Sequence, residues 1–134
     1  KDNGRDKENV IIYTPESVKE LINQAIIHLQ SKNIDEALNI LYKANKIQET
    51  NISNRLIGEI LLQKEDKNAL IYLKKAYYEF SSDPNFLNTL CYASIFSNDL
   101  NYAEKILREL KQLSPGSERI KIYENMILQR RKSE

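Results

Sequence analysis

The chain is poor in the residues on which most catalytic and metal sites depend. It has one cysteine, Cys91, one histidine, His28, and no tryptophan. A lone cysteine cannot form an intramolecular disulfide, and a lone histidine leaves no His pair or His/Cys cluster for zinc. The sequence also lacks a glycine-rich phosphate loop and a nucleophile beside a base. We therefore expect no enzyme activity, no metal and no cofactor.

Glycine, proline and net charge are scarce as well. Only 3 of the 134 residues are Gly and 3 are Pro, and 20 basic side chains face 19 acidic ones, for a formal net charge of +1. Gly and Pro, which interrupt helices, are few, and apolar residues do not alternate with polar ones as they do in β-strands. Both observations favour an all-helical chain. Near-neutral charge provides no general attraction for nucleic acid or anionic lipid, so we expect a partner to be recognised locally.

Long hydrophobic runs are missing too. No stretch approaches the roughly 18 apolar residues of a membrane span, and no signal peptide is visible. We expect no membrane insertion by this chain. Because the sequence begins with Lys1 rather than Met, we interpret it as an excised piece, from which an upstream anchor or export signal could have been trimmed. A cytoplasmic and a periplasmic location both stay open.

What the chain does contain is a repeated helix pair. Residues 84–115 read as two amphipathic helices separated by the polar turn 97–99. Two earlier stretches show the same arrangement, and the alanines that begin the second helices, Ala37, Ala69 and Ala103, are 32 and 34 residues apart. A period in this range, filled by helix pairs, predicts a stacked helical array whose units bury their apolar faces against one another.

The apolar spacing predicts seven helices within residues 14–134, after an extended or disordered lead-in at 1–13. Thr14, Asp83 and Ser114, each followed by Pro, are expected to cap three of the helices at their first residue. The predicted helices cover 15–30, 34–47, 52–63, 69–80, 84–96, 100–113 and 115–131.

Two ends of the predicted array allow alternatives. Val10 to Tyr13 form a short apolar run that either occupies the groove of the domain or only supports the first helix through Tyr13 and Val18. The last helix has no mate and is expected to cover the preceding pair. Its Ile122 and Met126 lie beside the covering stripe, and they predict either a wide buried face or a second contact, such as a homodimer.

The repeats resemble tetratricopeptide repeats, the third most closely. That family needs a small residue in each first helix, here Ala25, Gly58 and Cys91, and another early in each second helix. The resemblance covers residues 15–131. It departs in the connection after Gly58, which is one residue short, and in the turns, which lack the usual Gly. It implies an all-α, right-handed superhelical array of three helix hairpins plus a C-terminal capping helix.

The resemblance also implies a partner-binding concave face on the first helix of each pair. Ile22 and Ile26 occupy places where chaperone-type relatives hold a carboxylate, so an apolar or amphipathic peptide is the expected ligand. The alternative is that these side chains only pack against neighbouring helices. The residues placed on this face are Ile22, Ile26, Leu29, Arg55, Glu59, Asn88, Tyr92 and Phe96.

These features predict a noncatalytic scaffold that docks a protein or peptide, as part of a larger, envelope-associated bacterial protein. The assembly role is an analogy with the family. One alternative is a secretion or outer-membrane assembly chaperone that holds an extended client. Another is an RNA-binding helical array, which the near-neutral charge opposes.

Overall fold

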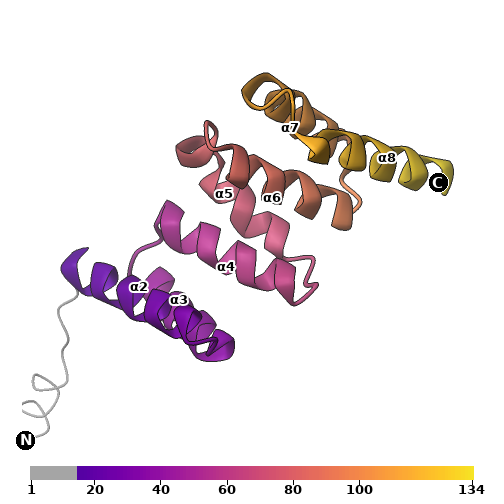
Figure 1. Ribbon diagram of the computed structural model, residues 1–134. Coiled ribbons are helices and arrows are strands. Elements are labelled where there is room, and N and C mark those ends of the chain that lie inside the picture. Colours follow the sequence, from indigo (N-terminus) through magenta and orange to yellow (C-terminus); the bar gives the residue numbers. More distant parts are fainter. Residues whose placement is uncertain (1–14) are drawn as a thin grey trace, which may run out of the picture. The chain divides into compact units, whose positions relative to one another are not determined.

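The computed structural model describes residues 15–134, and this part of the chain is all-helical, with no strand (Figure 1). None of its helices combines the length and the apolar character that crossing a membrane requires. The expected lead-in, the Thr14 cap and the Val10 to Tyr13 run lie outside the described residues. The helices are α2 (Pro15–Gln30), α3 (Ile34–Ile47), α4 (Asn51–Gln63), α5 (Ala69–Phe80), α6 (Pro84–Phe96), α7 (Leu100–Leu113) and α8 (Glu118–Lys132).

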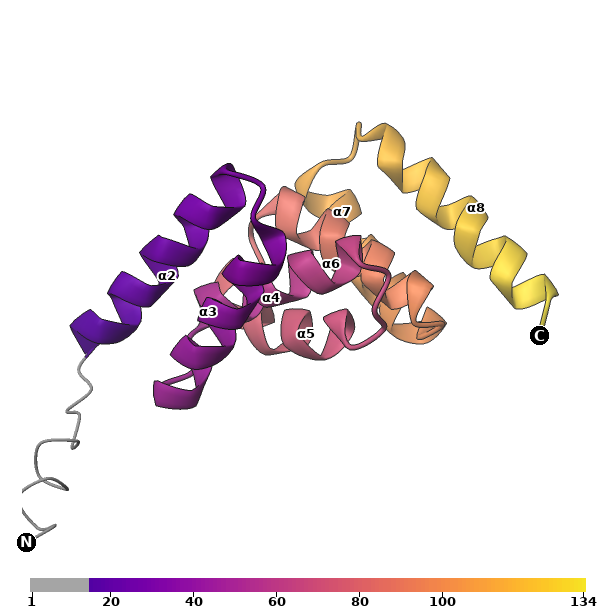
Figure 2. The ribbon, with the colours of Figure 1, turned by 90° about the horizontal axis from the view of Figure 1, so that it is seen from below.

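The helices belong to two compact units, the first ending at Glu49 and the second beginning at Thr50. In the first unit α2 packs against α3. In the second, α4 pairs with α5 and α6 with α7, and α8 packs on α6 and α7 (Figure 2). The predicted all-helical class and the pairing of sequence-adjacent helices are confirmed.

The first unit is a helix hairpin with small residues at its centre. Ala25 of α2 and Ala37 and Ala44 of α3 are completely buried. Alanine lets two helix backbones approach closely because its side chain is a single methyl group. Leu41 and Val18 add larger buried side chains to the same interface.

One turn geometry joins the two helices of every pair. Lys32, Glu65 and Asn98 have left-handed backbones, with φ of 65°, 59° and 61°, and they stand 33 residues apart. In the third turn the Asn98 N–H donates to the Ile95 carbonyl (2.9 Å) and the Asp99 N–H to the Ser94 carbonyl (2.8 Å). This Schellman pattern satisfies helix-end carbonyls, and it is usually built with Gly.

The α4–α5 pair accommodates a shorter connection. The N–H groups of Ala69 and Ile71 donate three residues back, to the carbonyls of Asp66 (3.0 Å) and Asn68 (3.1 Å). Such bonds form a tighter 3₁₀ turn than α-helical bonds do. The tight first turn of α5 brings Ala69 next to Gly58, which explains how the pair tolerates the missing residue.

Side-chain caps begin several helices of the second unit. The Asp83 carboxylate accepts from the N–H of Asn85 (2.9 Å) directly before α6, as predicted from the Asp-Pro pair. The prediction that Ser114–Pro115 begins the last helix is wrong. Ser114 ends α7, because its N–H donates to the Leu110 carbonyl, and Ser117 caps α8 by accepting from the Arg119 N–H at 3.2 Å.

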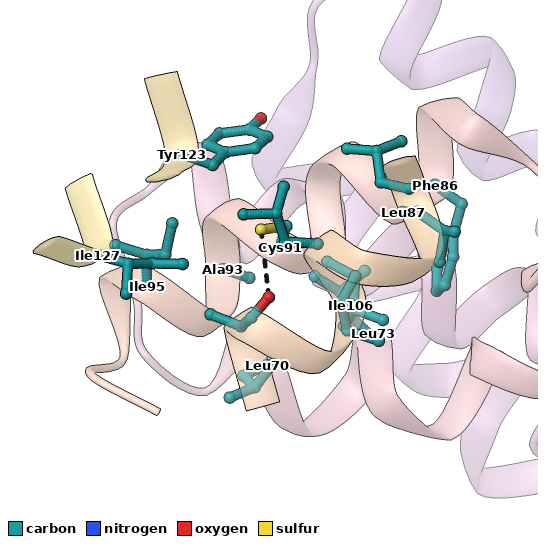
Figure 3. Packing of buried hydrophobic residues seen from close by; sticks show 14 of the residues in the cluster. Leu70, Leu73, Phe86, Leu87, Cys91, Ala93, Ile95, Ile106, Tyr123 and Ile127 are labelled. Carbon is teal, nitrogen blue, oxygen red and sulfur yellow. Dashed lines mark hydrogen bonds between the residues drawn. The ribbon is translucent and has the colours of Figure 1, made fainter. Parts of the chain in front are cut away.

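The core of the second unit centres on α6, and Figure 3 shows part of it. Leu87, Leu90 and Cys91 of α6 are completely buried, and the Cys91 thiol lies 3.6 Å from the Ala103 carbonyl oxygen of α7. The stripe of α8 predicted to cover the last pair is buried, as expected. This stripe consists of Ile120, Tyr123 and Ile127.

Candidate functional site

The α4 part of the predicted binding face is organised by Arg55. Its guanidinium donates to Glu59 Oε2 (3.1 Å), one turn along α4, and to Asp83 Oδ2 (3.0 Å) at the beginning of α6. The same group lies 4.7 Å from the ring centroid of Phe80 and 5.2 Å from that of Phe86. Arg55 therefore links α4 to α6 through charge and through cation–π contact.

The environment of Arg55 fixes its charge. Burial lowers the pKa of the guanidinium, but the bonds from both carboxylates outweigh burial and raise that pKa above its ordinary value. Burial likewise raises the pKa of the Asp83 carboxyl, and the bonds from Arg55 and the Asn85 N–H reverse this and lower that pKa. Both groups are thus ionised over the usual pH range. Arg55 and Glu59, which sequence analysis placed on the same face, lie in direct contact.

The α6 part of the face is a single stripe. Asn88, Tyr92 and Phe96 are each four residues apart, so they lie above one another on the helix. The Tyr92 side chain is 40% exposed, and Asn88 and Phe96 are half-buried. The Asn88 Oδ1 atom is buried and has no hydrogen-bond partner among residues 15–134. An unsatisfied buried acceptor costs free energy, which a donor supplied by a ligand or by water would recover.

Helix α8 borders this stripe. Tyr123 of α8 is buried against α6, and burial raises the pKa of its phenol, with Cys91 and Tyr92 among the neighbouring groups. Met126, predicted as part of a second contact, is half-buried and packs against the core. Ile122, its predicted companion, is 52% exposed. The two residues are therefore hidden to different degrees.

The remaining predicted contacts lie in the first unit. Ile22 is buried, whereas Ile26 and Leu29, further along α2, are half-buried. In their present conformations only Ile26 and Leu29 present accessible apolar surface. The contact of all three with a partner stays a prediction.

The described residues offer little reactive chemistry. Between residues 15 and 134 no three His, Cys, Asp or Glu side chains lie close enough together to hold a metal ion. Burial raises the pKa of the Cys91 thiol to about 12, so the reactive thiolate is absent near neutral pH. His28 makes a 3.4 Å contact with the Asn33 amide at the end of α2.

Sequence analysis missed the polar contacts that join α5 to α7. The Tyr77 hydroxyl donates to Glu109 Oε1 (2.5 Å), and Lys105 Nζ donates to Glu109 Oε2 (2.9 Å). Lys74 Nζ lies 4.3 Å from the ring centroid of Tyr102. Tyr77 and Glu109 stand 32 residues apart, close to one repeat, so the repeat period was the signal that could have found them.

Sequence analysis also missed a groove between α7 and α8. The ion pairs of this groove could not be predicted from the positions of the charged residues in the sequence. Each of its ion pairs joins residues of two different helices.

Comparison of the chain with models of protein families and with curated proteins gives no match, so the functional argument depends on the fold and on these side chains.

Proposed function

We propose that the chain is a noncatalytic protein-interaction scaffold of the tetratricopeptide-like kind, which docks an apolar or amphipathic peptide segment of a partner protein. The all-helical pairs of the structure support this fold assignment. The small residues at the helix crossings, among them Ala25, Gly58 and Cys91, support it as well. In this proposal the helices form a right-handed superhelical array, and α8 is its cap.

The observation that carries the proposal is the α6 stripe. It combines an accessible aromatic ring, Tyr92, with a buried acceptor, Asn88 Oδ1, for which the described part of the chain supplies no donor. Aromatic side chains are frequent anchors of protein interfaces, and a polar group left unsatisfied in the free protein can fix the register of a ligand. A peptide that lies along α6 would cover the Tyr92 ring, and a rotation of the half-buried Asn88 side chain would bring its amide oxygen within reach of a peptide N–H.

Arg55 has a supporting role in this proposal. Its guanidinium is already occupied by two carboxylates, so it holds the beginning of α6 in place and does not serve as the main cation for a ligand. Glu59 keeps partial exposure and offers an acceptor beside the stripe. The expected ligand is therefore one that presents apolar groups and backbone N–H donors.

The test is affinity purification of partners from the native cell with Tyr92→Ala and a matched control, Tyr78→Ala. Both replacements remove an exposed tyrosine ring, but Tyr78 lies on α5 and is 88% exposed. We expect Tyr92→Ala to lose a specific protein that the natural chain and Tyr78→Ala both retain, at unchanged thermal stability. Retention of every partner by Tyr92→Ala would reject the α6 stripe as the binding face.

A further inference from the structure

A groove of about 410 Å³ runs between α7 and α8. Its apolar floor consists of Leu107 on α7 and Ile127 and Leu128 on α8. Leu107 and Ile127 are buried, but Leu128 is 50% exposed, so the groove presents accessible apolar surface. The groove is separate from the α6 stripe, because none of the stripe residues lines it.

Two ion pairs close the ends of the groove. At one end Arg131 of α8 meets Glu104 of α7 at 3.1 Å, and at the other Lys111 of α7 meets Glu124 of α8 at 2.5 Å. The two helices thus run antiparallel. We call the four ion-paired residues the corners of the groove: each helix has one negative corner, Glu104 or Glu124, and one positive corner, Lys111 or Arg131. Going around the groove, the four charged corners alternate in sign.

We propose that this groove is the surface through which two copies of the chain associate. A two-fold interface brings the same patch of both copies together, so the patch must be complementary to itself. Alternating corners meet this condition. If the axis runs parallel to the helices, Glu104 faces Arg131 of the second copy, and Lys111 faces its Glu124.

Arg108, at the centre of the groove, favours this orientation of the two-fold axis. Arg108 lies between the two ion pairs of the groove and makes no ion pair of its own among residues 15–134. With the axis parallel to the helices, α7 of one copy covers α8 of the other, so Arg108 lies over Ile127 and Leu128 of the second copy. Its aliphatic stem can cover apolar surface while the charged end stays in water.

The other in-plane axis, which runs across the helices, is less favourable. It sets α7 of one copy against α7 of the other, with Glu104 facing Lys111. The corners still attract, but the two Arg108 side chains then approach each other near the centre. Like charges at such a contact repel. The second copy is therefore expected with α7 over α8.

The first test uses sedimentation velocity of the 134-residue chain over a wide concentration range. We expect a reversible dimer. Leu128→Glu should raise the dissociation constant at least about tenfold, because it places a charge in the apolar centre. Ile122→Glu is the matched control, since Ile122 is equally exposed on the same helix, about 120° away around its axis. Its dissociation constant should match that of the natural chain.

Two outcomes would overturn the proposal. One is a monomer at every concentration. The other is a dimer that Ile122→Glu dissociates and Leu128→Glu leaves intact, because the contact would then lie on a different face of α8, outside the groove. Thermal unfolding of each variant, expected to stay close to that of the natural chain, separates lost association from lost folding.

A charge exchange tests the orientation. The double variant Glu104→Arg with Arg131→Glu keeps the ion pair within each copy but places both positive corners on α7. With the axis parallel to the helices every corner still faces an opposite charge, so the dissociation constant should change by less than about threefold. With the axis across the helices like charges would meet, and loss of the dimer in this variant would overturn the proposed orientation.

Discussion

A Cβ atom built on Gly58 of α4 would lie 2.5 Å from Leu73 Cγ of α5, so the two helices cross where only glycine fits. Glycine normally weakens a helix interior by roughly 1 kcal/mol relative to alanine. Here we expect the opposite sign. Gly58→Ala should reduce the free energy of unfolding by about 1–3 kcal/mol, because Leu73 or the α5 backbone must move.

Urea unfolding measures this change, and Gly116→Ala is the control. An added Cβ at Gly116 meets no atom within 4 Å, and the position has no left-handed backbone. The control should be neutral or slightly stabilising. If Gly58→Ala were as stable as Gly116→Ala, the close crossing of α4 and α5 would be refuted.

The left-handed turn residues predict stabilising substitutions. The backbone of Glu65 is left-handed, a conformation in which a side chain is strained and which glycine adopts without steric cost. Glu65→Gly should therefore increase the free energy of unfolding by about 0.5–1 kcal/mol, after the greater freedom of glycine in the unfolded chain is subtracted. Asn98→Gly should gain less, because asparagine tolerates this conformation better. Equal gains at both positions would argue that backbone strain is not the cause.

The Arg55–Asp83 pair predicts a dependence of stability on pH. The folded-state pKa of Asp83 is lower than its ordinary value of 3.8, so the ionised carboxylate stabilises the fold above about pH 4. This contribution is lost as the pH falls through the folded-state pKa. Asp83→Asn keeps a good helix cap but removes the charge. We expect it to cost about 1 kcal/mol at pH 7.

Chemical unfolding at pH 7 and at pH 2.5 checks the sign of this effect. The stability difference between the natural chain and Asp83→Asn should shrink at the lower pH, which lies below the ordinary pKa of 3.8, because the unfolded chain then binds the proton. A difference that stayed constant between the two pH values would show that the charge of Asp83 contributes nothing to folding.

Cys91 predicts slow labelling by thiol reagents. Its sulfur is completely buried, and burial raises its pKa to about 12. Reaction with a disulfide reagent at pH 8 should therefore follow opening of the α6–α7 core and speed up steeply as urea approaches the unfolding midpoint. A fast reaction in native buffer, at the rate of a free thiol, would contradict the packing of Cys91 under α8.

The helix pairs could be predicted from sequence because their signals are local. Apolar spacing located the helices, and polar clusters located the turns to within a residue or two. The beginning of α8 was missed because two caps, Ser114 with Pro115 and Ser117, compete within one turn of helix. Which of the two serines caps α8 depends on whether the Ser114 N–H donates to a carbonyl of α7, as it does in the structure.

The candidate site could be predicted only in part. The resemblance to tetratricopeptide repeats implied that Asn88, Tyr92 and Phe96 lie on the binding face, and their four-residue spacing puts them on one stripe of α6. Sequence could not show that Arg55 is held by Asp83, 28 residues away, or that Asn88 Oδ1 receives no donor from the residues that the structure describes. Both facts depend on how α4 and α8 lie against α6, which local periodicity does not determine.

The second unit has the same turn at two places, which bears on how it would respond to the deletion of a repeat. Glu65 and Asn98 occupy the same backbone conformation, each followed by a residue with the same backbone hydrogen bond into the preceding helix. Deleting residues 66–98 would join α4 directly to α7 through an unaltered joint. Loss or duplication of 33 residues between these two positions would therefore change the number of helices by two and keep the backbone conformation of this turn.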